Sequence, residues 1–464
     1  VEKTLQKING MFAISLFNLD ENTLYLIRDR AGEKPLYYGI QNNLLLFGSE
    51  LKIFKRHPDF KREVCRDALS KFIQINYIPS PLSIYKSVKK IPPGTYVKIS
   101  LNDISAANKS ALNPIRYWNL NIDNKINNLT HYDQNLYINQ LDKLLHTSIE
   151  RQMIGDVPLG LFLSGGIDST LIASIMQKMS KDKIQTFTIG FNEKNYDESL
   201  FAKNIADFIN TDHNLFMLDS KNLLEIIPNL PNIFDEPFAD KAQLPAIMLS
   251  KMAKSKVTVA LSGDGGDELF AGYSRYTNNA LLWRYIEKTP SVIISFIKYI
   301  LKMFNYIPDA ILVNITSMLG KLFSQGNINR NQLNRILYML NSNSRIELNE
   351  RSISHQLDLN NLLLGDKKNN FFNYDLVNNH KFANYIDEMA NIDFNIYLPD
   401  DILVKIDRSS MYSSLETRVP FLDYNIIEFA YNLPLSMKIN GNQSKWILKE
   451  VLKKYVPENL FNRP

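Results

Sequence analysis

The chain has 464 residues, which is enough for two to three domains with a sizeable core. Apolar residues make up 45% and charged residues 22%, as in ordinary globular proteins, and the net charge of +5 comes from scattered basic residues, so charge gives no reason to expect a nucleic-acid partner. The single cysteine, Cys65, excludes an internal disulfide framework and a cysteine-rich metal site, and it indicates a reducing compartment such as the cytoplasm.

The two ends of the chain and its most apolar region bear on processing and membranes. No signal-peptide pattern opens the chain, which starts at Val1 and stops at Pro464 without a closing element, so we expect a fragment of a longer protein. Residues 291–323 are the most apolar, but Lys298, Lys302, Pro308 and Asp309 interrupt them. We therefore expect buried helices there and no membrane partner.

The first third of the chain predicts a β-rich domain. Short apolar runs separated by turns predict strands at residues 11–17, 23–27, 36–38 and 44–47, followed by a helix over residues 67–78. Residues 102–128 are rich in Asn and Ser and predict a linker, in which Tyr117 and Trp118 anchor the chain to a neighbouring surface. A long helix is expected from about residue 131 to 153.

The second half alternates strands with helices. Apolar runs predict strands at residues 159–163, 184–191, 213–218 and 257–261, with helices at residues 171–179 and 199–209. This alternation predicts an α/β fold with a doubly wound parallel sheet, which binds ligands at the carboxyl ends of its strands. The chain from about Arg284 onward reads as nearly all helical.

A glycine turn joins the first of these strands to its helix. Ser164-Gly165-Gly166 is followed by Asp168, Ser169 and Thr170 at the start of the helix. Free backbone N–H groups at a helix N-terminus suit a phosphate, and Asp168 suits a phosphate that carries Mg²⁺. The alternative is a tight turn in which Asp168 or Ser169 caps the helix. The string SGGIDS resembles the pyrophosphate-binding loop of the ATP pyrophosphatase families.

A second loop of glycines and carboxylates, Ser262 to Glu268, follows the strand at residues 257–261. Two such loops can face each other across one crevice of a parallel sheet, which would let Asp168 and Asp267 share Mg²⁺. The alternative is that Asp264, Asp267 and Glu268 are first-turn carboxylates favoured by the helix dipole. The pair of loops favours a metal–triphosphate site.

Further acidic segments leave two interpretations open. Asp197-Glu198-Ser199 is explained by helix capping. The segment Asp235-Glu236-Pro237-Phe238-Ala239-Asp240 could instead hold a cationic group of a substrate.

The basic residues of the second half can likewise be interpreted as structural or as ligand-binding. Lys405 is placed to stabilise its helix through an i,i+4 pair with Asp401. Arg418 suits a carboxylate or phosphate, or an ion pair with Glu416 or Asp423. Lys445 opens the last clear helix and contacts either a phosphate oxygen or solvent.

Family blocks run through nearly the whole chain. They are INGMFAISLFN, RDRAGEKPLYYG, FGSELK, IPSPLSIYKSVKKIPPG, LFLSGGIDST, DEPFAD, ALSGDGGDELFAGY, LPDDILVKIDRSSM, LETRVPFLD and QSKWILK. Together and in this order, they resemble glutamine-dependent asparagine synthetase, the asparagine synthetase B family. The resemblance implies a ligase of the glutamine-hydrolysing asparagine synthase type, with ATP and Mg²⁺. Aspartate, activated as β-aspartyl-AMP with pyrophosphate released, would receive nitrogen from glutamine or ammonia as AMP leaves.

The resemblance also implies domains and site residues. Residues 1–120 would be a partial glutamine amidotransferase domain of the N-terminal-nucleophile type, and residues 125–464 the ATP-binding synthetase domain. Ser164, Gly165, Gly166, Asp168 and Ser169 would hold pyrophosphate and Mg²⁺. Four residues would contact the adenosine: Phe162, Ile189, Ser262 and Gly263. The implied catalytic residues are Asp264, for forming the adenylate, Asp267, which binds Mg²⁺, and Lys445, which offsets charge on the transferring phosphate.

The chain departs from the family pattern in two places. The nucleophilic cysteine of the glutaminase is missing and Cys65 does not match it, so we expect this chain to use ammonia only. Lys241 and Gln243 stand where small residues are expected, which keeps open a related amidotransferase that amidates a sugar carboxylate in surface-polysaccharide synthesis.

Two further functions are disfavoured by the residues present. An inert nucleotide-binding fragment is disfavoured because Asp168, Asp267 and Lys445 are intact, and a tRNA-thiolating enzyme is disfavoured because a lone cysteine cannot supply a thiol pair. A homodimer is the candidate assembly.

Overall fold

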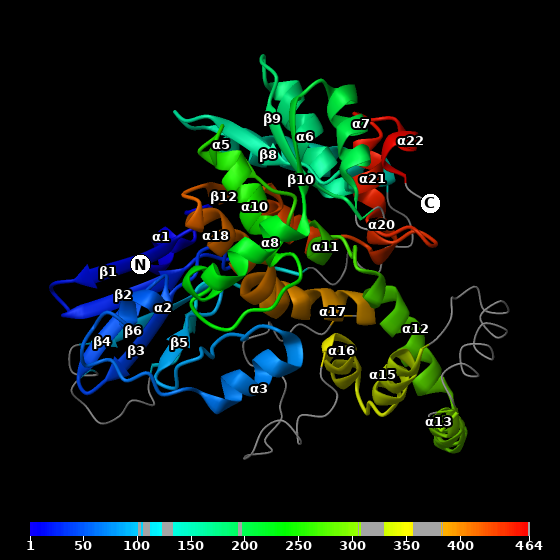
Figure 1. The fold of residues 1–464 in the computed structure, drawn as a ribbon, viewed down its shortest axis with the longest axis horizontal. Coiled ribbons are helices and arrows are strands. Elements are labelled where there is room, and N and C mark those ends of the chain that lie inside the picture. The colour runs from blue at the N-terminus through cyan, green and yellow to red at the C-terminus, as the bar shows by residue number, and fades with distance from the viewer. Residues whose placement is uncertain are drawn as a thin grey trace.

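The computed structural model describes residues 1–100, 104, 112–122, 133–193, 197–304, 306–307, 329–355, 382 and 384–462. Figure 1 shows two antiparallel sheets formed by the first part of the chain and a separate parallel sheet formed by the second part, with helices between and below them. Both sheet types match the prediction from the sequence.

Two antiparallel sheets build the first part. One has the order β1-β2-β6-β7 and the other β4-β3-β5. Their bounds are β1 Ala13–Asn18, β2 Thr23–Arg28, β3 Tyr37–Gln41, β4 Leu44–Gly48, β5 Val88–Lys90, β6 Thr95–Ser100 and β7 Ile115–Arg116, with the helices α1 Glu2–Leu5, α2 Leu51–Phe54 and α3 Arg66–Ile75. Leu26 and Val97 from the first sheet pack against Tyr38 from the second, so the two sheets share one apolar core.

The expected linker lies partly outside the described residues, but its anchor does not. Tyr117 and Trp118 are both buried, and the Tyr117 hydroxyl donates a hydrogen bond of 2.8 Å to the Arg28 carbonyl. The anchoring role of these two aromatic residues is therefore confirmed. The long helix that follows, α5, runs from Gln134 to Met153, with the Asp133 side chain as its N-cap.

A five-stranded parallel sheet organises the second part, with the order β10-β9-β8-β11-β12. The strands are β8 Leu159–Phe162, β9 Gln185–Phe191, β10 Asp212–Leu218, β11 Val259–Leu261 and β12 Glu416–Arg418, and the helices that alternate with them are α6 Ile167–Met179, α7 Ser199–Ile209, α8 Ser220–Ile226, α9 Leu230–Ile233, α10 Gln243–Lys254 and α11 Gly266–Leu269. A short 3-10 turn, Ile227–Asn229, joins α8 to α9.

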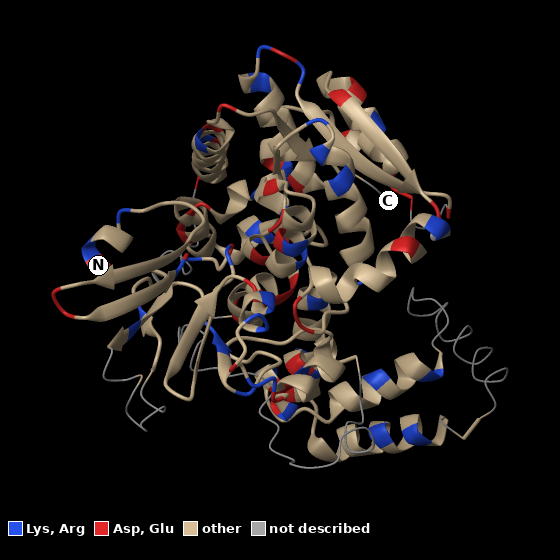
Figure 2. Ribbon diagram, turned by 60° about the vertical axis from the view of Figure 1, so that its left-hand side comes forward, with Lys and Arg blue, Asp and Glu red and all other residues tan. Residues whose placement is uncertain are grey.

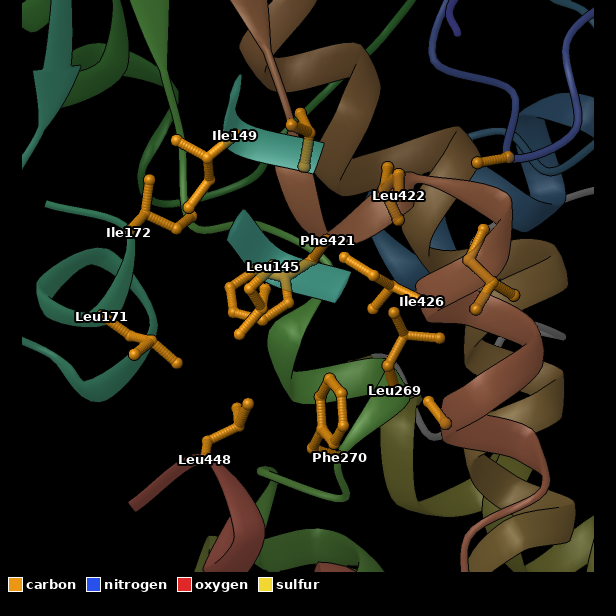
Figure 3. Packing of buried hydrophobic residues seen from close by; sticks show 14 of the residues in the cluster. Leu145, Ile149, Leu171, Ile172, Leu269, Phe270, Phe421, Leu422, Ile426 and Leu448 are labelled. Atoms are coloured by element: carbon orange, nitrogen blue, oxygen red, sulfur yellow. The ribbon is translucent and has the colours of Figure 1, made fainter. Parts of the chain in front are cut away.

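Apolar side chains cover both faces of this sheet. On one face Leu161 and Leu261 belong to the main core with α5, α6 and α21 (Trp446–Leu452). Figure 3 shows part of that core, in which Leu145 and Ile149 of α5 face Leu171 and Ile172 of α6. On the other face Phe187 and Ala260 pack against Ala253 of α10. A sheet buried on both faces is the doubly wound architecture that the sequence predicts.

The remaining elements are helical, as expected. They are α12 Ser274–Lys288, α13 Ser291–Phe304, α15 Arg330–Leu340, α16 Arg345–Ile353, α17 Tyr385–Ile392, a π-helix at Asp393–Ile402, α18 Leu403–Tyr412, a 3-10 turn at Pro420–Leu422, α19 Tyr424–Tyr431, α20 Leu435–Lys438 and α22 Glu458–Phe461. No described helix is both long and apolar enough to cross a membrane.

One expectation for this helical region is wrong. We expected buried helices over residues 291–323, yet α13 has no buried residue. The rest of that segment, from residue 308 onward, lies outside the described residues.

Candidate functional site

The two glycine–carboxylate loops lie side by side. β8 and β11 are parallel neighbours, with Leu161 opposite Leu261 in the register, so the loops that follow both strands leave the same edge of the sheet. The predicted meeting of the two loops at one crevice is therefore observed.

The first loop leaves the N-terminus of α6 without a side-chain cap. Gly165 adopts φ +71°, which favours glycine, and Gly166 is the N-cap residue. Ser169 does not cap the helix through its first N–H groups; its hydroxyl accepts from the Ser164 N–H at 3.2 Å and lies 3.0 Å from the Ser164 hydroxyl. The capping alternative is therefore wrong for this helix, and its N-terminal N–H groups can serve a ligand.

Lys445 joins the two loops. Its ammonium lies 2.5 Å from Asp168 Oδ2 in the first loop and 2.7 Å from Asp267 Oδ1 in α11. The residue is buried at the N-cap of α21, which excludes the solvent-exposed alternative. One cation thus holds carboxylates that stand 99 residues apart in the chain and belong to two different loops.

Glycine at position 272 makes this arrangement possible. A Cβ atom there would overlap both the Asp267 carboxylate and the Lys445 side chain. Gly272 follows α11 and was not singled out from the sequence, because nothing local shows that a lysine from residue 445 passes beside it.

Burial dominates the electrostatics of the site. It raises the pKa of Asp168 to about 6, although the Lys445 charge opposes the shift. Burial also raises the pKa of Asp264, against the attraction of Lys405. For Lys445 burial alone would lower the pKa, but the carboxylates of Asp168 and Asp267 outweigh it and leave the pKa above its ordinary value.

These side chains border a cavity of about 470 Å³ at the edge of the sheet. Nine of the twelve predicted site residues line it: Phe162, Ser164, Asp168, Ser169, Ile189, Ser262, Gly263, Asp264 and Asp267. The other three, Gly165, Gly166 and Lys445, do not line the cavity. Lys445 nevertheless pairs with two residues that do, Asp168 and Asp267. The volume and the mixed apolar and polar lining suit a small-molecule substrate.

Six polar residues outside the twelve predicted ones also line the cavity: Thr188, Glu198, Ser250, Glu268, Tyr273 and Lys405. Lys405 faces Asp264, and its ion pair is with Asp240 at 2.9 Å rather than the helical pair with Asp401 that we expected. Glu268 is buried and accepts a hydrogen bond of 2.6 Å from the Tyr273 hydroxyl. Burial, followed by the nearby Asp267 charge, raises the pKa of Glu268 to about 8.

Other candidate residues serve the scaffold. Asp235 accepts the Leu51 N–H at 2.7 Å, and Glu236 pairs with Lys90 at 2.6 Å, so both carboxylates bind the first part of the chain. Arg418 pairs with Glu416 at 2.7 Å, which is the ion-pair alternative. Asp197 accepts the N–H groups of Ser199, the first residue of α7, and of Phe191, whereas Glu198, the N-cap residue itself, makes no side-chain cap hydrogen bond.

A second cavity, of about 330 Å³, lies on the other side of Asp240. Lys241, Arg335 and His355 line it, and among the described residues neither Lys241 nor Arg335 forms an ion pair. Burial lowers the pKa of His355, and the charges of Arg335 and Lys241 lower it further. The buried Tyr77 hydroxyl, which also borders the cavity, has no hydrogen-bond partner in the part of the chain that the structure describes.

The first cavity is compatible with a divalent cation. Asp168 Oδ1 is buried and has no hydrogen-bond partner among the described residues, and Asp267 lies across Lys445 from it. The described residues contain no cluster of three or more potential metal-binding side chains. Two carboxylates suit Mg²⁺, which commonly takes one or two protein ligands and completes its shell with water and phosphate oxygens.

Comparison with known proteins covers the whole chain. The sequence profile of the family described as asparagine synthase matches residues 140–464, and that of the glutamine amidotransferase domain matches residues 2–113. Glutamine-hydrolyzing asparagine synthetase 1 of Bacillus subtilis is 29% identical over 100% of this chain and 68% of its own length. Putative glutamine-hydrolyzing asparagine synthetase 2 of Methanocaldococcus jannaschii is 35% identical over 62% of this chain and 54% of its own.

Among solved structures, the NH3-dependent NAD synthetase of Campylobacter jejuni is 17% identical, with a TM-score of 0.23 over 31% of this chain and 62% of that protein, a likeness too weak to support a conclusion. The chain spans about two thirds of the length of the Bacillus subtilis relative.

Proposed function

Since the chain belongs to the asparagine synthase family, we propose that it catalyses the ATP-dependent amidation of the aspartate side chain to asparagine. The observation that carries this proposal is the position of Lys445, buried between Asp168 and Asp267 where two neighbouring parallel strands end. That arrangement concentrates a cation and two carboxylates beside an uncapped helix N-terminus, which suits a nucleoside triphosphate.

The proposed reaction has two steps. An oxygen of the acceptor carboxylate attacks the α-phosphorus of ATP, the bond to the β-phosphate oxygen breaks, and pyrophosphate leaves, which gives β-aspartyl-AMP. Ammonia then attacks the acyl carbon, the bond from this carbon to the phosphate oxygen breaks, AMP leaves with that oxygen and the electron pair, and one proton is released. We assign the pyrophosphate to Ser164, Gly165, Gly166 and Ser169, the adenosine to Phe162, Ile189, Ser262 and Gly263, and formation of the adenylate to Asp264.

Charge is the main obstacle to the first step, because a carboxylate must approach a phosphate. Lys445 offsets negative charge on the transferring phosphate. Asp168 and Asp267 would hold Mg²⁺, which supplies further positive charge to the phosphates when bound. Lys405, which pairs with Asp240 and interacts with Asp264, contributes a second cation to the lining of the cavity.

Ammonia is the proposed nitrogen source for this chain. Cys65 is its single cysteine, and the residue lies at the start of α3, outside both cavities described above. We assign residues 1–120 to a partial glutamine amidotransferase domain without its nucleophile and residues 125–464 to the synthetase domain. A reducing compartment such as the cytoplasm fits the single thiol.

A sugar carboxylate is the second candidate acceptor. It is favoured by the 330 Å³ cavity beside Asp240, where Lys241 and Arg335 present positive charge to any anionic group. The Asp240–Lys405 ion pair stands between the two cavities, because Lys405 lines the first and Asp240 the second.

The deciding experiment measures pyrophosphate release from Mg-ATP in the presence of different acceptors and nitrogen sources. Release that requires aspartate and ammonium and fails with glutamine supports the proposal. Release with a hexuronic acid but without aspartate dependence supports the second candidate. Absence of release with either acceptor contradicts both functions.

A further inference from the structure

Helix α13 (Ser291–Phe304) exposes an unusual amount of apolar surface. Val292 is 78% exposed, Phe296 62%, Tyr299 61% and Met303 51%, and no residue of the helix is buried. Figure 1 places α13 at the margin of the molecule, away from all three sheets. Single exposed apolar residues are normal, but a continuous apolar face marks a contact surface.

The four most exposed apolar residues form one face of the helix, and Ile293, Ile297 and Ile300 extend the exposed apolar surface beside it. Val292, Phe296, Tyr299 and Met303 follow one another at intervals of four, three and four residues, which places them in a single stripe. Ile294 and Leu301 occupy the less exposed side. The helix is therefore apolar on the face that is turned away from the rest of the protein.

The sequence that contains this helix is rich in basic residues, although Glu287 lies shortly before it. Between residues 288 and 340 the sequence holds six Lys and Arg residues but a single acidic residue, Asp309. This excess equals the net charge of +5 of the whole chain, so the basic residues are less evenly scattered than the composition suggested. In Figure 2 the helices that reach the lower right margin carry several basic segments.

An apolar helix face flanked by cations matches the chemistry of an anionic lipid surface. Its apolar side chains enter the acyl boundary, while Lys302 and the preceding Lys288, both exposed, reach the headgroups. At 14 residues the helix is about 21 Å long, too short to cross a hydrocarbon core of about 30 Å. It can therefore lie along a bilayer but cannot span one.

We propose that α13 binds this protein peripherally to membranes that contain anionic lipids. A second copy of the chain is a less favourable occupant. Pairing α13 of one copy with α13 of another would bring their lysines together, and α13 contains no acidic side chain to offset them. The proposal replaces the expectation of no membrane partner and is independent of the amidation chemistry.

The test is co-sedimentation of the 464-residue protein with vesicles of three parts phosphatidylcholine to one part phosphatidylglycerol, beside vesicles of phosphatidylcholine alone. We expect binding to the anionic vesicles that weakens with salt. Phe296→Ser or Met303→Ser should each lower the partition coefficient about tenfold. Lys288→Gln and Lys302→Gln should each lower it about fivefold on anionic vesicles.

Leu224→Ser is the matched control, because Leu224 is 65% exposed on α8, outside this surface. It should leave the partition coefficient unchanged, and all variants should retain the pyrophosphate release of the parent protein. Equal binding to both vesicle types, or binding that Phe296→Ser does not reduce, would overturn the proposal. A concentration-dependent dimer that Phe296→Ser dissociates would overturn it in favour of a second copy.

Discussion

Lys445 is the residue of the candidate site whose loss should lower activity most, because it contacts a carboxylate from each loop. We expect Lys445→Ala to reduce pyrophosphate release by about 10²–10³-fold, since the charge that faces the transferring phosphate is lost. The measurement is the initial rate at saturating Mg-ATP, with circular dichroism to verify folding. Lys453→Ala is the matched control, because Lys453 pairs with Glu450 on the surface of the same region. A folded Lys445→Ala protein with a near-normal rate would contradict the assignment.

A substitution at Gly272 also perturbs the contact between Lys445 and Asp267, because both side chains pass close to the backbone of this glycine. Gly272→Ala should lower the rate at least about tenfold, because the added methyl group displaces the Asp267 carboxylate or the Lys445 side chain. Gly155→Ala is the control, since a Cβ at position 155 meets no atom within 4 Å. Equal rates for both alanine variants would mean that the Lys445–Asp267 contact does not matter for turnover.

At the scale of elements, a buried ion pair ties the β-rich part to the synthetase part. Lys90 of β5 lies 2.6 Å from Glu236, and both side chains are almost fully buried. Lys90→Met should lower the free energy of unfolding by about 3–5 kcal/mol, because the buried Glu236 carboxylate loses its cation and keeps only neutral donors such as the Ile84 N–H.

Urea denaturation checks this prediction. Lys86→Met, whose pair with Glu63 is exposed, should cost at most about 1 kcal/mol. Equal decreases in the free energy of unfolding for the two variants would show that the buried pair contributes no more to stability than the exposed one.

His213 on the edge strand β10 predicts a pH dependence of stability. Burial lowers its pKa, and its buried Nε2 has no partner within the described ranges, so protonation of the imidazole is less favourable in the folded state than in the unfolded chain. Because the unfolded chain binds that proton more readily, this residue should make the protein less stable as the pH falls below about 6.5. His213→Gln should flatten the loss of melting temperature between pH 7 and pH 5.5. A melting curve series identical to that of the parent protein would contradict this explanation.

The features that the sequence predicts well are those encoded locally. The glycine–carboxylate loops follow apolar strands directly, so their meeting at one sheet edge follows from the parallel topology of β8 and β11. The roles of the site residues remain predictions. The partners of Asp235 and Glu236 were not readable, because Leu51 and Lys90 lie more than 140 residues away. Periodicity showed that α13 is apolar but not what its apolar face contacts.

At the scale of the whole molecule, the candidate nucleotide cavity joins segments that are distant in the chain, from β8 and β9 to α10, α11 and α18. A ligand that binds only this folded arrangement must stabilise it by mass action. Mg-ATP at about 100 times its dissociation constant should therefore raise the free energy of unfolding by about 2.7 kcal/mol. ATP with EDTA should give a clearly smaller shift, because the triphosphate then meets Asp168 and Asp267 without the cation that offsets their charge. Asp168→Asn, which removes one of these charges, should narrow the difference between the two conditions in a thermal-shift assay. Equal stabilisation of the parent protein by ATP with and without Mg²⁺ would contradict the metal assignment while leaving nucleotide binding intact.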